Sequence, residues 1–293
     1  MTWQTRLGGT TYCSGYWRLD ANSKRSFAHY LIHLNATLNL IRGGQFVLFH
    51  DDPDFFDHVR VMAERKSIAV RGHRIALNEL PAFWAGEALL AGCRRMVGSR
   101  YLTDPTYRKD KGVAHFRREY AVSGEESYRK LMAIWMSKIP LIADVAIHAK
   151  HFDSDRYAWM DISVSRFRLL REGWDFTRAG IPPEKISHYG TDSWYQGKML
   201  KLNASYLCGD PVAWRRLDGY FDQALKAHLA DDYAHDEETV LGHVQTEHPS
   251  LFNTIGNMHR GLKRKIFRFA DNRLRALQIR AMSFGRPRAG GTA

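Results

Sequence analysis

One carboxylate stands inside an otherwise mostly apolar stretch of the sequence. Asp161 interrupts the run from Tyr157 to Val164, which predicts a strand. Burying a carboxylate costs free energy unless it is paired or binds a cation. At the carboxyl end of a parallel strand it would face the crevice in which such sheets bind ligands. Asp161 is therefore a candidate metal or ligand site, the alternative being a carboxylate satisfied by a neighbouring Arg or by backbone amides.

A dense group of titratable residues lies further along the chain, at His235, Asp236, Glu237 and Glu238. They precede a predicted helix, and one of the carboxylates could act as a general base or hold an acceptor group, since a base needs only reach and a suitable pKa. Acidic residues are also expected at a helix N-terminus because of the helix dipole. Both interpretations stay open at this point.

Two further pairs have spacings that chemistry uses. His148 and His151 could ligate a metal from one helical turn, but no Cys or carboxylate stands at a good spacing to join them, which favours surface histidines. Trp194 and Tyr195 lie in a polar loop flanked by glycine, as sugar-stacking aromatics often do. Ordinary loop packing accounts for them equally well.

The sequence lacks the motifs of several large enzyme classes. It has no GxGxxG after a strand, no GxxxxGK[ST], no HExxH and no GxSxG. Dinucleotide enzymes, P-loop enzymes, zincins and typical α/β-hydrolases are therefore disfavoured. The three cysteines form no CxxC pair, so neither a disulfide framework nor a cysteine zinc site is expected.

The elements that position these residues alternate between strands and helices. Residues 9–14 predict a strand, residues 25–42 an amphipathic helix, and the apolar run Phe46–Phe49 a strand buried on both faces. A strand is also predicted at 67–70. Strand, helix and strand at this spacing predict a parallel sheet covered by helices.

The second half of the chain predicts further elements of the same kind. A helical region at 127–150 contains Pro140, so we expect a break or kink near Ser137 and Lys138. Asp210 followed by Pro211 predicts the start of a helix, and Asp236 the cap of another. Three further segments complete the prediction: a strand at 199–207, long loops with short elements at 165–198, and a basic, loop-like region at 86–126.

The positive charge is concentrated at the end of the chain. The 293 residues carry a net charge of +12, of which +9 lies in residues 258–293. We therefore expect a domain with its own chemistry at 1–257, followed at 258–293 by a basic amphipathic helix with a disordered end. Such a helix is suited to lying on anionic lipid. A terminal helix docked on the body or an oligomer contact would have the same pattern. The N-terminus lacks a signal-peptide pattern and no apolar run could span a bilayer, so a soluble cytoplasmic protein is expected.

Six segments in sequence order resemble one known family. They are Thr10–Tyr12 with Arg25–Tyr30, Phe46–Asp52, Met136–Leu141, Tyr157–Asp161, Asn203–Asp210 with Trp214, and Ala234–Val240 with Pro249–Phe252. Together they cover roughly residues 8 to 256 and resemble the bacterial HtrL/YibB-type (WlaTC-type) family. Its members are glycosyltransferases of the GT-A kind, and they commonly serve surface polysaccharide synthesis.

The resemblance implies an α/β fold of the GT-A-like, Rossmann-like kind, with a mostly parallel sheet flanked by helices and the basic tail appended. It implies a nucleotide-sugar donor and a glycan or lipid-linked acceptor, in lipopolysaccharide or capsule synthesis at the inner face of the cytoplasmic membrane, held there by residues 258–288. The donor-binding residues implied are Thr10, Tyr12, Arg25, Asp51, Asp52, Lys138 and Asp161. Asp161 would hold Mn²⁺ or Mg²⁺, while Lys138 and Arg25 would neutralise the leaving diphosphate. The catalytic residues implied are Asp236 and Glu237, and the acceptor-binding residues Trp194, Tyr195 and Gly209.

The sequence also departs from the family. Ser163 stands where a glycine is usual, and Asp161 has no aspartate two residues further on, so the DxD pair common in GT-A enzymes is missing. Two alternatives follow: an inactive member of the fold acting in an assembly complex, and a polyanion-binding protein that uses the basic tail. The near balance of charge in residues 1–257, at +3, makes nucleic acid an unlikely partner.

Overall fold

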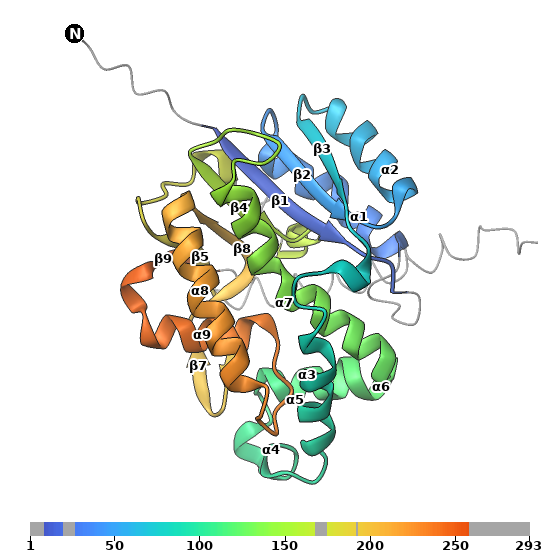
Figure 1. The fold of residues 1–293 in the computed structure, drawn as a ribbon, viewed down its shortest axis with the longest axis vertical. Helices are drawn as coiled ribbons and strands as arrows, with labels where there is room; N and C mark the ends of the chain where they lie inside the picture. The colour runs from blue at the N-terminus through green and yellow to red at the C-terminus, as the bar shows by residue number, and fades with distance from the viewer. Residues whose placement is uncertain (1–8, 20–26, 168–174, 192, 258–293) are drawn as a thin grey trace, which may run out of the picture.

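The computed structural model describes residues 9–19, 27–167, 175–191 and 193–257. Its centre is a seven-stranded sheet in the order β3-β2-β1-β4-β8-β5-β9 (Figure 1). Six of these strands run in the same direction, and β8 alone runs antiparallel to its neighbours β4 and β5. The strands of the sheet are β1 (Thr10–Tyr16), β2 (Gln45–His50), β3 (Ala69–Arg74), β4 (Arg156–Met160), β5 (Ile186–Gly190), β8 (Asn203–Gly209) and β9 (Phe252–Asn257). The predicted α/β fold with a mostly parallel sheet is confirmed.

Helices cover both faces of this sheet. One face packs against α1 (Phe27–Leu38) and α2 (Pro53–Glu64), and the other against α3 (Ala85–Arg95), α7 (Glu125–Ile147), α8 (Pro211–His228) and α9 (Glu237–Glu247). The β2 strand shows why both faces are filled. Phe46 and Leu48 belong to the core on the α1 side, while Val47 and Phe49 belong to the core on the α7 side. The prediction of a strand buried on both faces is therefore confirmed.

The long helix α7 is continuous, and the predicted break near Ser137 and Lys138 is wrong. Pro140 lies inside the helix, where it removes one backbone hydrogen bond. Most of the surrounding side chains, among them Met136, Ile139 and Leu141, are buried against the sheet and neighbouring helices. Because burial of an apolar side chain contributes about 1.5–3 kcal/mol, packing outweighs the lost bond. The helix consequently carries Lys138 to the middle of the fold.

Residues 86–126 are mostly helical, and the predicted loop-like region is wrong. After α3 the chain forms α4 (Arg100–Thr103), α5 (Lys111–His115), a π-helical turn over Phe116–Tyr120 and α6 (Ala121–Ser123). Short helices such as α5 have little stability of their own and depend on tertiary contacts. A pattern based on local periodicity therefore does not detect them. No helix among the described residues is long and apolar enough to cross a membrane.

Two predicted strands have different bounds in the structure. The strand expected at Tyr157–Val164 ends at Met160, so Asp161 follows the strand instead of lying within it. In place of the single strand expected at 199–207, the chain forms two strands, β7 (Lys198–Leu200) and then β8. The β7 strand pairs with β6 (Ser193–Tyr195) in a separate hairpin. The helix starts predicted at Asp210 and Asp236 are confirmed, since each side chain caps its helix.

Candidate active site

A buried lysine lies at the carboxyl end of β4. The Nζ atom of Lys138, from the middle of α7, is 2.9 Å from Oδ1 of Asp161 and 2.5 Å from Oε1 of Glu237. Lys138 is only 5% exposed. Asp161 directly follows β4, and Glu237 is the first residue of α9. The structure therefore brings together three of the predicted site residues, from positions 99 and 23 residues apart.

The backbone and neighbouring side chains fix the position of Asp161. Its amide donates to the carbonyl of Ser205 at 2.9 Å, so the chain continues against β8 for one residue beyond β4. The indole Nε1 of Trp159 donates to Oδ1 at 3.1 Å, and Nη2 of Arg166 is 3.4 Å from Oδ2. The carboxylate thus lies between two cations and an indole donor.

The charges of Lys138 and Asp161 stabilise each other. Burial alone would raise the pKa of Asp161, but Lys138 and Arg166 outweigh it and hold this pKa well below its usual range. Burial would likewise lower the pKa of Lys138, yet Asp161 and Glu237 outweigh it and raise this pKa. Both side chains are therefore ionised at neutral pH.

The acidic run after His235 divides among different partners. Asp236 caps α9 by accepting from the amide of Thr239 at 2.8 Å, and its second oxygen is 2.6 Å from Nε2 of His115. Lys111 lies 3.2 Å from the same oxygen and also forms an ion pair with Glu238. Burial would raise the pKa of Asp236, but Lys111 and His115 outweigh it and lower this pKa strongly. Asp236 and Glu238 therefore share Lys111, whereas Glu237, which lies between them in the sequence, pairs with Lys138.

Three basic residues of this cluster could not be recognised in the sequence. Lys111 and His115 lie in the region predicted as a loop, and no spacing relates them to Asp236, which is more than 120 residues away. Arg166 lies five residues after Asp161 on a short 3-10 helix, Val164–Phe167. Its signal was local: a basic residue soon after a carboxylate at a strand end. One of the two interpretations of Asp161 from the sequence, a carboxylate satisfied by a neighbouring Arg, therefore accounts for part of its surroundings.

The residues around Asp161 do not fit the expected divalent metal. Glu237, the other carboxylate that contacts Lys138, is bridged to Asp161 by the Lys138 ammonium. A metal ion placed on Asp161 would also meet Arg166. Mn²⁺ or Mg²⁺ prefers several oxygen ligands, and here the neighbouring positive charges would oppose it. In this arrangement a lysine supplies the positive charge at the end of β4.

The predicted donor residues of the first strands divide between the two ends of the sheet. Asp51 and Asp52 follow β2, at the same end as Asp161. Asp52 caps α2 through the amide of Phe55 at 3.0 Å and lies 3.6 Å from Arg18. Thr10 lies at the amino end of β1, opposite Arg156 at the start of β4. The structure therefore does not bring Thr10 to the cluster.

Three other predicted residues also lie outside the charged cluster or the described chain. Tyr12 is buried in the core on the α1 side of the sheet. Gly209 pairs with Tyr157 at the amino end of β4, where an added Cβ would lie 2.7 Å from Ile186 Cδ1. Arg25 lies outside the described residues, as does the tail from 258 onward.

The hairpin β6–β7 carries the predicted acceptor aromatics. The ring of Tyr195 packs edge-on against the rings of Tyr233 and His235, at centroid distances of 5.5 and 5.9 Å. Asp110 accepts from the amide of Gly197 and anchors the turn of the hairpin. Tyr195 is therefore next to the loop that leads to Asp236, whereas Nζ of Lys109 lies over the Trp194 ring, 6.0 Å from its centroid.

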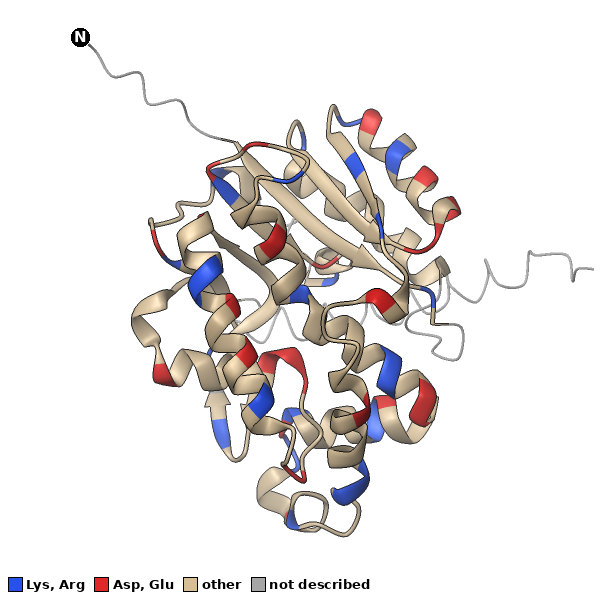
Figure 2. Ribbon diagram, viewed as in Figure 1, with Lys and Arg blue, Asp and Glu red and all other residues tan. Residues whose placement is uncertain are grey.

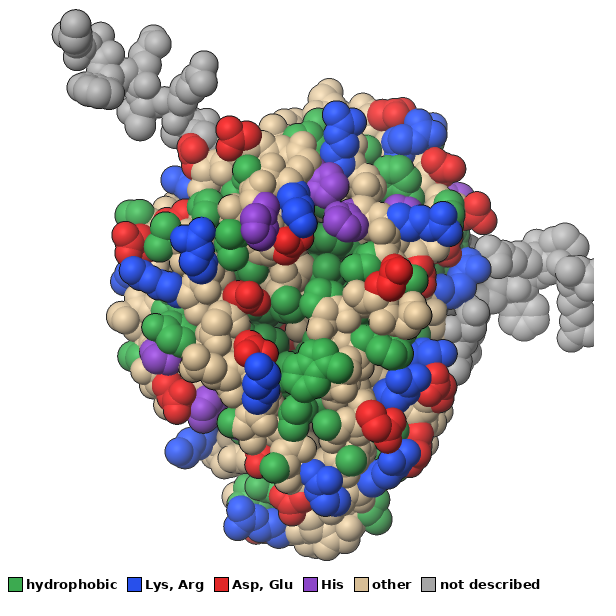
Figure 3. Space-filling model, in the orientation of Figure 1, with side chains coloured by type: hydrophobic (Ala, Val, Ile, Leu, Met, Phe, Trp, Pro, Cys, Tyr) green, Lys and Arg blue, Asp and Glu red, His purple; other side chains and the backbone are tan. Residues whose placement is uncertain are grey.

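Charge and apolar surface are distributed differently on the molecule. Basic and acidic residues alternate over the ribbon without forming a domain of one sign (Figure 2). The face shown in Figure 3 has apolar side chains gathered over its middle, with charged side chains of both signs around them.

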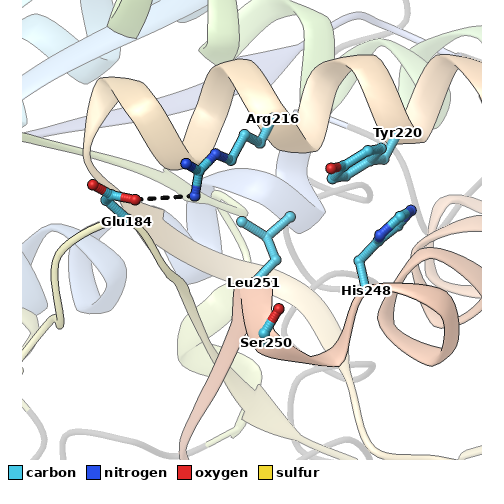
Figure 4. A pocket seen from close by; sticks show the side chains of 6 residues that line it. All are labelled: Glu184, Arg216, Tyr220, His248, Ser250 and Leu251. Carbon is cyan, nitrogen blue, oxygen red and sulfur yellow. Dashed lines mark ion pairs between the residues drawn. The ribbon is translucent and has the colours of Figure 1, made fainter.

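A separate cavity of about 280 Å³ lies at the other end of the sheet. Glu184 precedes β5 and Ser250 precedes β9, so this cavity opens at the amino ends of these strands. Its walls include the ion pair of Glu184 with Arg216 at 3.0 Å and the stacked rings of Tyr220 and His248 (Figure 4). It shares no residue with the charged cluster.

Comparisons with known proteins do not assign a function to this chain. No protein family and no curated protein matches the sequence. Among solved structures, core-mannan synthase A from Aspergillus fumigatus in its Mn/GDP form has 8% identity and a TM-score of 0.42, covering 87% of this chain and 74% of that chain. Mouse xyloside xylosyltransferase 1, in its apo form, has 9% identity and a TM-score of 0.39, covering 84% and 85%. Similarities this weak carry no argument about the activity of this chain.

Proposed function

We propose that this protein is a GT-A-like glycosyltransferase that moves a sugar from a nucleotide-sugar donor to a glycan or lipid-linked acceptor. The observation that carries the proposal is the buried ammonium of Lys138, held between Asp161 and Glu237 at the carboxyl end of β4. Ligands of such sheets bind beyond the carboxyl ends of the parallel strands. The sequence resemblance, whose segments include all three residues, supplies the reaction class.

Positive charge is what the donor half of this reaction needs. When the bond between the anomeric carbon and the phosphate oxygen breaks, negative charge develops on the departing nucleotide phosphate. Lys138 and Arg166 are the cations that contact Asp161, and Arg166 is partly exposed, so both are placed to stabilise that charge. No step of this proposal passes through a metal ion.

The acceptor half favours Glu237 over Asp236 as the residue that contacts the acceptor hydroxyl. Asp236 is 1% exposed, caps α9 and has a strongly lowered pKa, so it is a weak base whose oxygens are already engaged. Glu237 is held by Lys138, which a bound donor phosphate would draw away. Asp236 then positions the start of α9, and Glu237 faces the reacting groups.

The acceptor and its cellular setting complete the proposal. Tyr195, on the hairpin beside the loop before Asp236, would contact the acceptor sugar together with Trp194. The basic residues 258–288 would hold the enzyme on anionic lipid at the cytoplasmic face of the membrane, where surface polysaccharide precursors are built. Asp51, at the same end of the sheet as Asp161, would contact the nucleoside.

Donor binding and turnover test this function directly. Thermal unfolding is measured with UDP-, GDP-, CMP- and dTDP-sugars, with and without Mn²⁺, for the wild type and for Lys138→Met and Asp161→Asn. Ligand that binds only the folded state raises the melting temperature. We expect one nucleotide class to raise it without Mn²⁺ and to release free nucleotide when acceptor glycans are added. Lys138→Met should abolish both effects, whereas Lys130→Met, an exposed lysine of the same helix, should retain them.

Two results would contradict the proposal. Donor binding without nucleotide release in the presence of any acceptor preparation would support an inactive assembly partner. No shift with any donor, combined with salt-dependent RNA binding that is lost on truncation after Asn257, would support a polyanion-binding protein.

A further inference from the structure

A second cluster of side chains that can ligate a metal lies beside the start of α9, which carries Glu237. His228 is the last residue of α8, Asp231 lies in the loop that follows, and His235 directly precedes the cap of α9. We call these three residues the histidine–aspartate triad. One donor atom from each lies within 4.8 Å of the others. Oδ2 of Asp231 is 3.0 Å from Nδ1 of His228 and 3.0 Å from Nε2 of His235.

These distances are close to those that a transition metal requires. Two bonds of about 2.1 Å at a tetrahedral angle place their donor atoms about 3.4 Å apart. The two His–Asp spacings of 3.0 Å differ from this value by a few tenths of an ångström, and the donor atoms of the two histidines lie within 4.8 Å of each other, so side-chain rotations would bring all three atoms onto one ion. Two imidazole nitrogens and one carboxylate oxygen favour zinc and related ions over Mg²⁺ or Ca²⁺.

The surroundings of the triad support a ligand role. The second nitrogen of His235, Nδ1, is 3.1 Å from Oγ1 of Thr239, which fixes the ring as partners of metal-bound histidines do. The side chain of His235 is 1% exposed and that of His228 9% exposed.

One coordination position would remain accessible. The side chain of Asp231 is 37% exposed, so water can reach the triad from the loop side while both rings face the interior. Three protein ligands plus a water or exchangeable group are typical of open zinc sites.

We propose that His228, Asp231 and His235 form a binding site for a single divalent transition-metal ion of the zinc class, with an open fourth position. The ion would join the end of α8 to the start of α9 and so fix the loop that leads to Asp236 and Glu237. This site is separate from the donor end of β4 and goes beyond the proposed transferase activity.

Equilibrium dialysis of untagged, chelator-treated protein against micromolar Zn²⁺ tests the proposal, with bound metal measured by mass spectrometry. We expect one Zn²⁺ per chain in the wild type and at least about tenfold weaker binding in Asp231→Asn and His235→Gln. His243→Gln is the matched control, because its ring lies 4.9 Å from His228 but outside the triad. Asp161→Asn should also retain the ion, which separates this site from the transferase proposal.

A second measurement does not depend on any variant being folded. Co²⁺ added to the wild type should give visible absorption bands of a low-coordinate nitrogen and oxygen site, which one equivalent of Zn²⁺ abolishes. Absence of stoichiometric zinc would overturn the proposal. So would zinc that Asp231→Asn retains and His73→Gln loses, because His73 and His151, 3.0 Å apart, would then be the ligands.

Discussion

Acidic residues follow two strands of the same sheet, and the two places use them differently. Asp51 and Asp52 follow β2, and Asp161 follows β4, with β1 between the two strands. Neighbouring strands are about 4.8 Å apart, so these ends are separated by about 10 Å. Asp52 caps a helix and pairs with an Arg whose side chain is 42% exposed, whereas Asp161 contacts a lysine buried in the fold.

The residues that follow each acid explain the difference. Pro53 comes directly after Asp52, and proline at the first helical position makes the preceding aspartate a cap. Directly after Asp161 the described chain forms only the short 3-10 helix Val164–Phe167, so its carboxylate is left to Lys138 of α7 and to Arg166. The same local pattern, an acid after an apolar strand, therefore predicts a stabilising cap in one place and a candidate reaction centre in the other.

The largest effect is expected from removing the buried cation. Lys138→Met leaves the buried Glu237 without its ion-pair partner and leaves Arg166 as the one cation that contacts Asp161 among the described residues, so the free energy of unfolding should fall by about 3–5 kcal/mol in urea titrations. Adding Asp161→Asn and Glu237→Gln to Lys138→Met should recover most of the loss, because no unpaired charge then remains. A triple variant as unstable as the single one would show that packing of the lysine stem, not charge, is what the site requires.

The pH dependence of stability should differ in sign between Asp161 and Asp51. The pKa of Asp161 is lowered, so its ionised form contributes stability that is complete above the usual value of 3.8 and is lost as the pH falls through the lowered native pKa. The pKa of Asp51 is raised, first by burial, so its ionisation opposes folding at neutral pH and not below its usual pKa.

Unfolding measured between pH 7 and about pH 3 checks both signs. Asp161→Asn should lower the melting temperature at pH 7 and flatten the acid limb of the stability curve. Asp51→Asn should raise the melting temperature slightly at pH 7 and change nothing at the acid end. A change of melting temperature at pH 7 with the same sign in both variants would contradict the opposite roles expected for Asp161 and Asp51.

The smallest effect is expected at the helix cap. Asp52→Ala removes the acceptor for the Phe55 amide and should cost about 0.5–2 kcal/mol. Asp52→Asn keeps a capping oxygen and should cost less, with the donor-induced thermal shift unchanged. Loss of that shift in Asp52→Asn, with stability intact, would instead give Asp52 a role in donor binding.

Much of the fold was predictable because its signals are local. The apolar run of β2 and the Asp210–Pro211 helix start each depend on a few adjacent residues, and both are confirmed. The continuity of α7 was not predictable, because the packing that stabilises the helix around Pro140 comes from the rest of the molecule. The short helices between 100 and 123 were missed for the same reason.

The candidate site was predictable in its acids but less so in its cations. Asp161, Asp236 and Glu237 are conspicuous in the sequence because carboxylates are rare in apolar runs or dense at a helix start. Lys138 came from a resemblance, and nothing in the sequence pairs Lys111 with Asp236. Such pairings depend on how distant segments meet.

The separation of these partners along the chain also affects how the protein folds. Lys138 and Glu237 are 99 residues apart in the sequence, so their contact closes a long loop of the chain that contains β4, β8 and α8. Because loop-closure entropy must be offset before such a contact stabilises the chain, we expect this contact to form late in folding. Interactions absent from the transition state set the unfolding rate. We therefore expect the ion pairs of Lys138 to slow unfolding of the native protein and to have little effect on its folding rate.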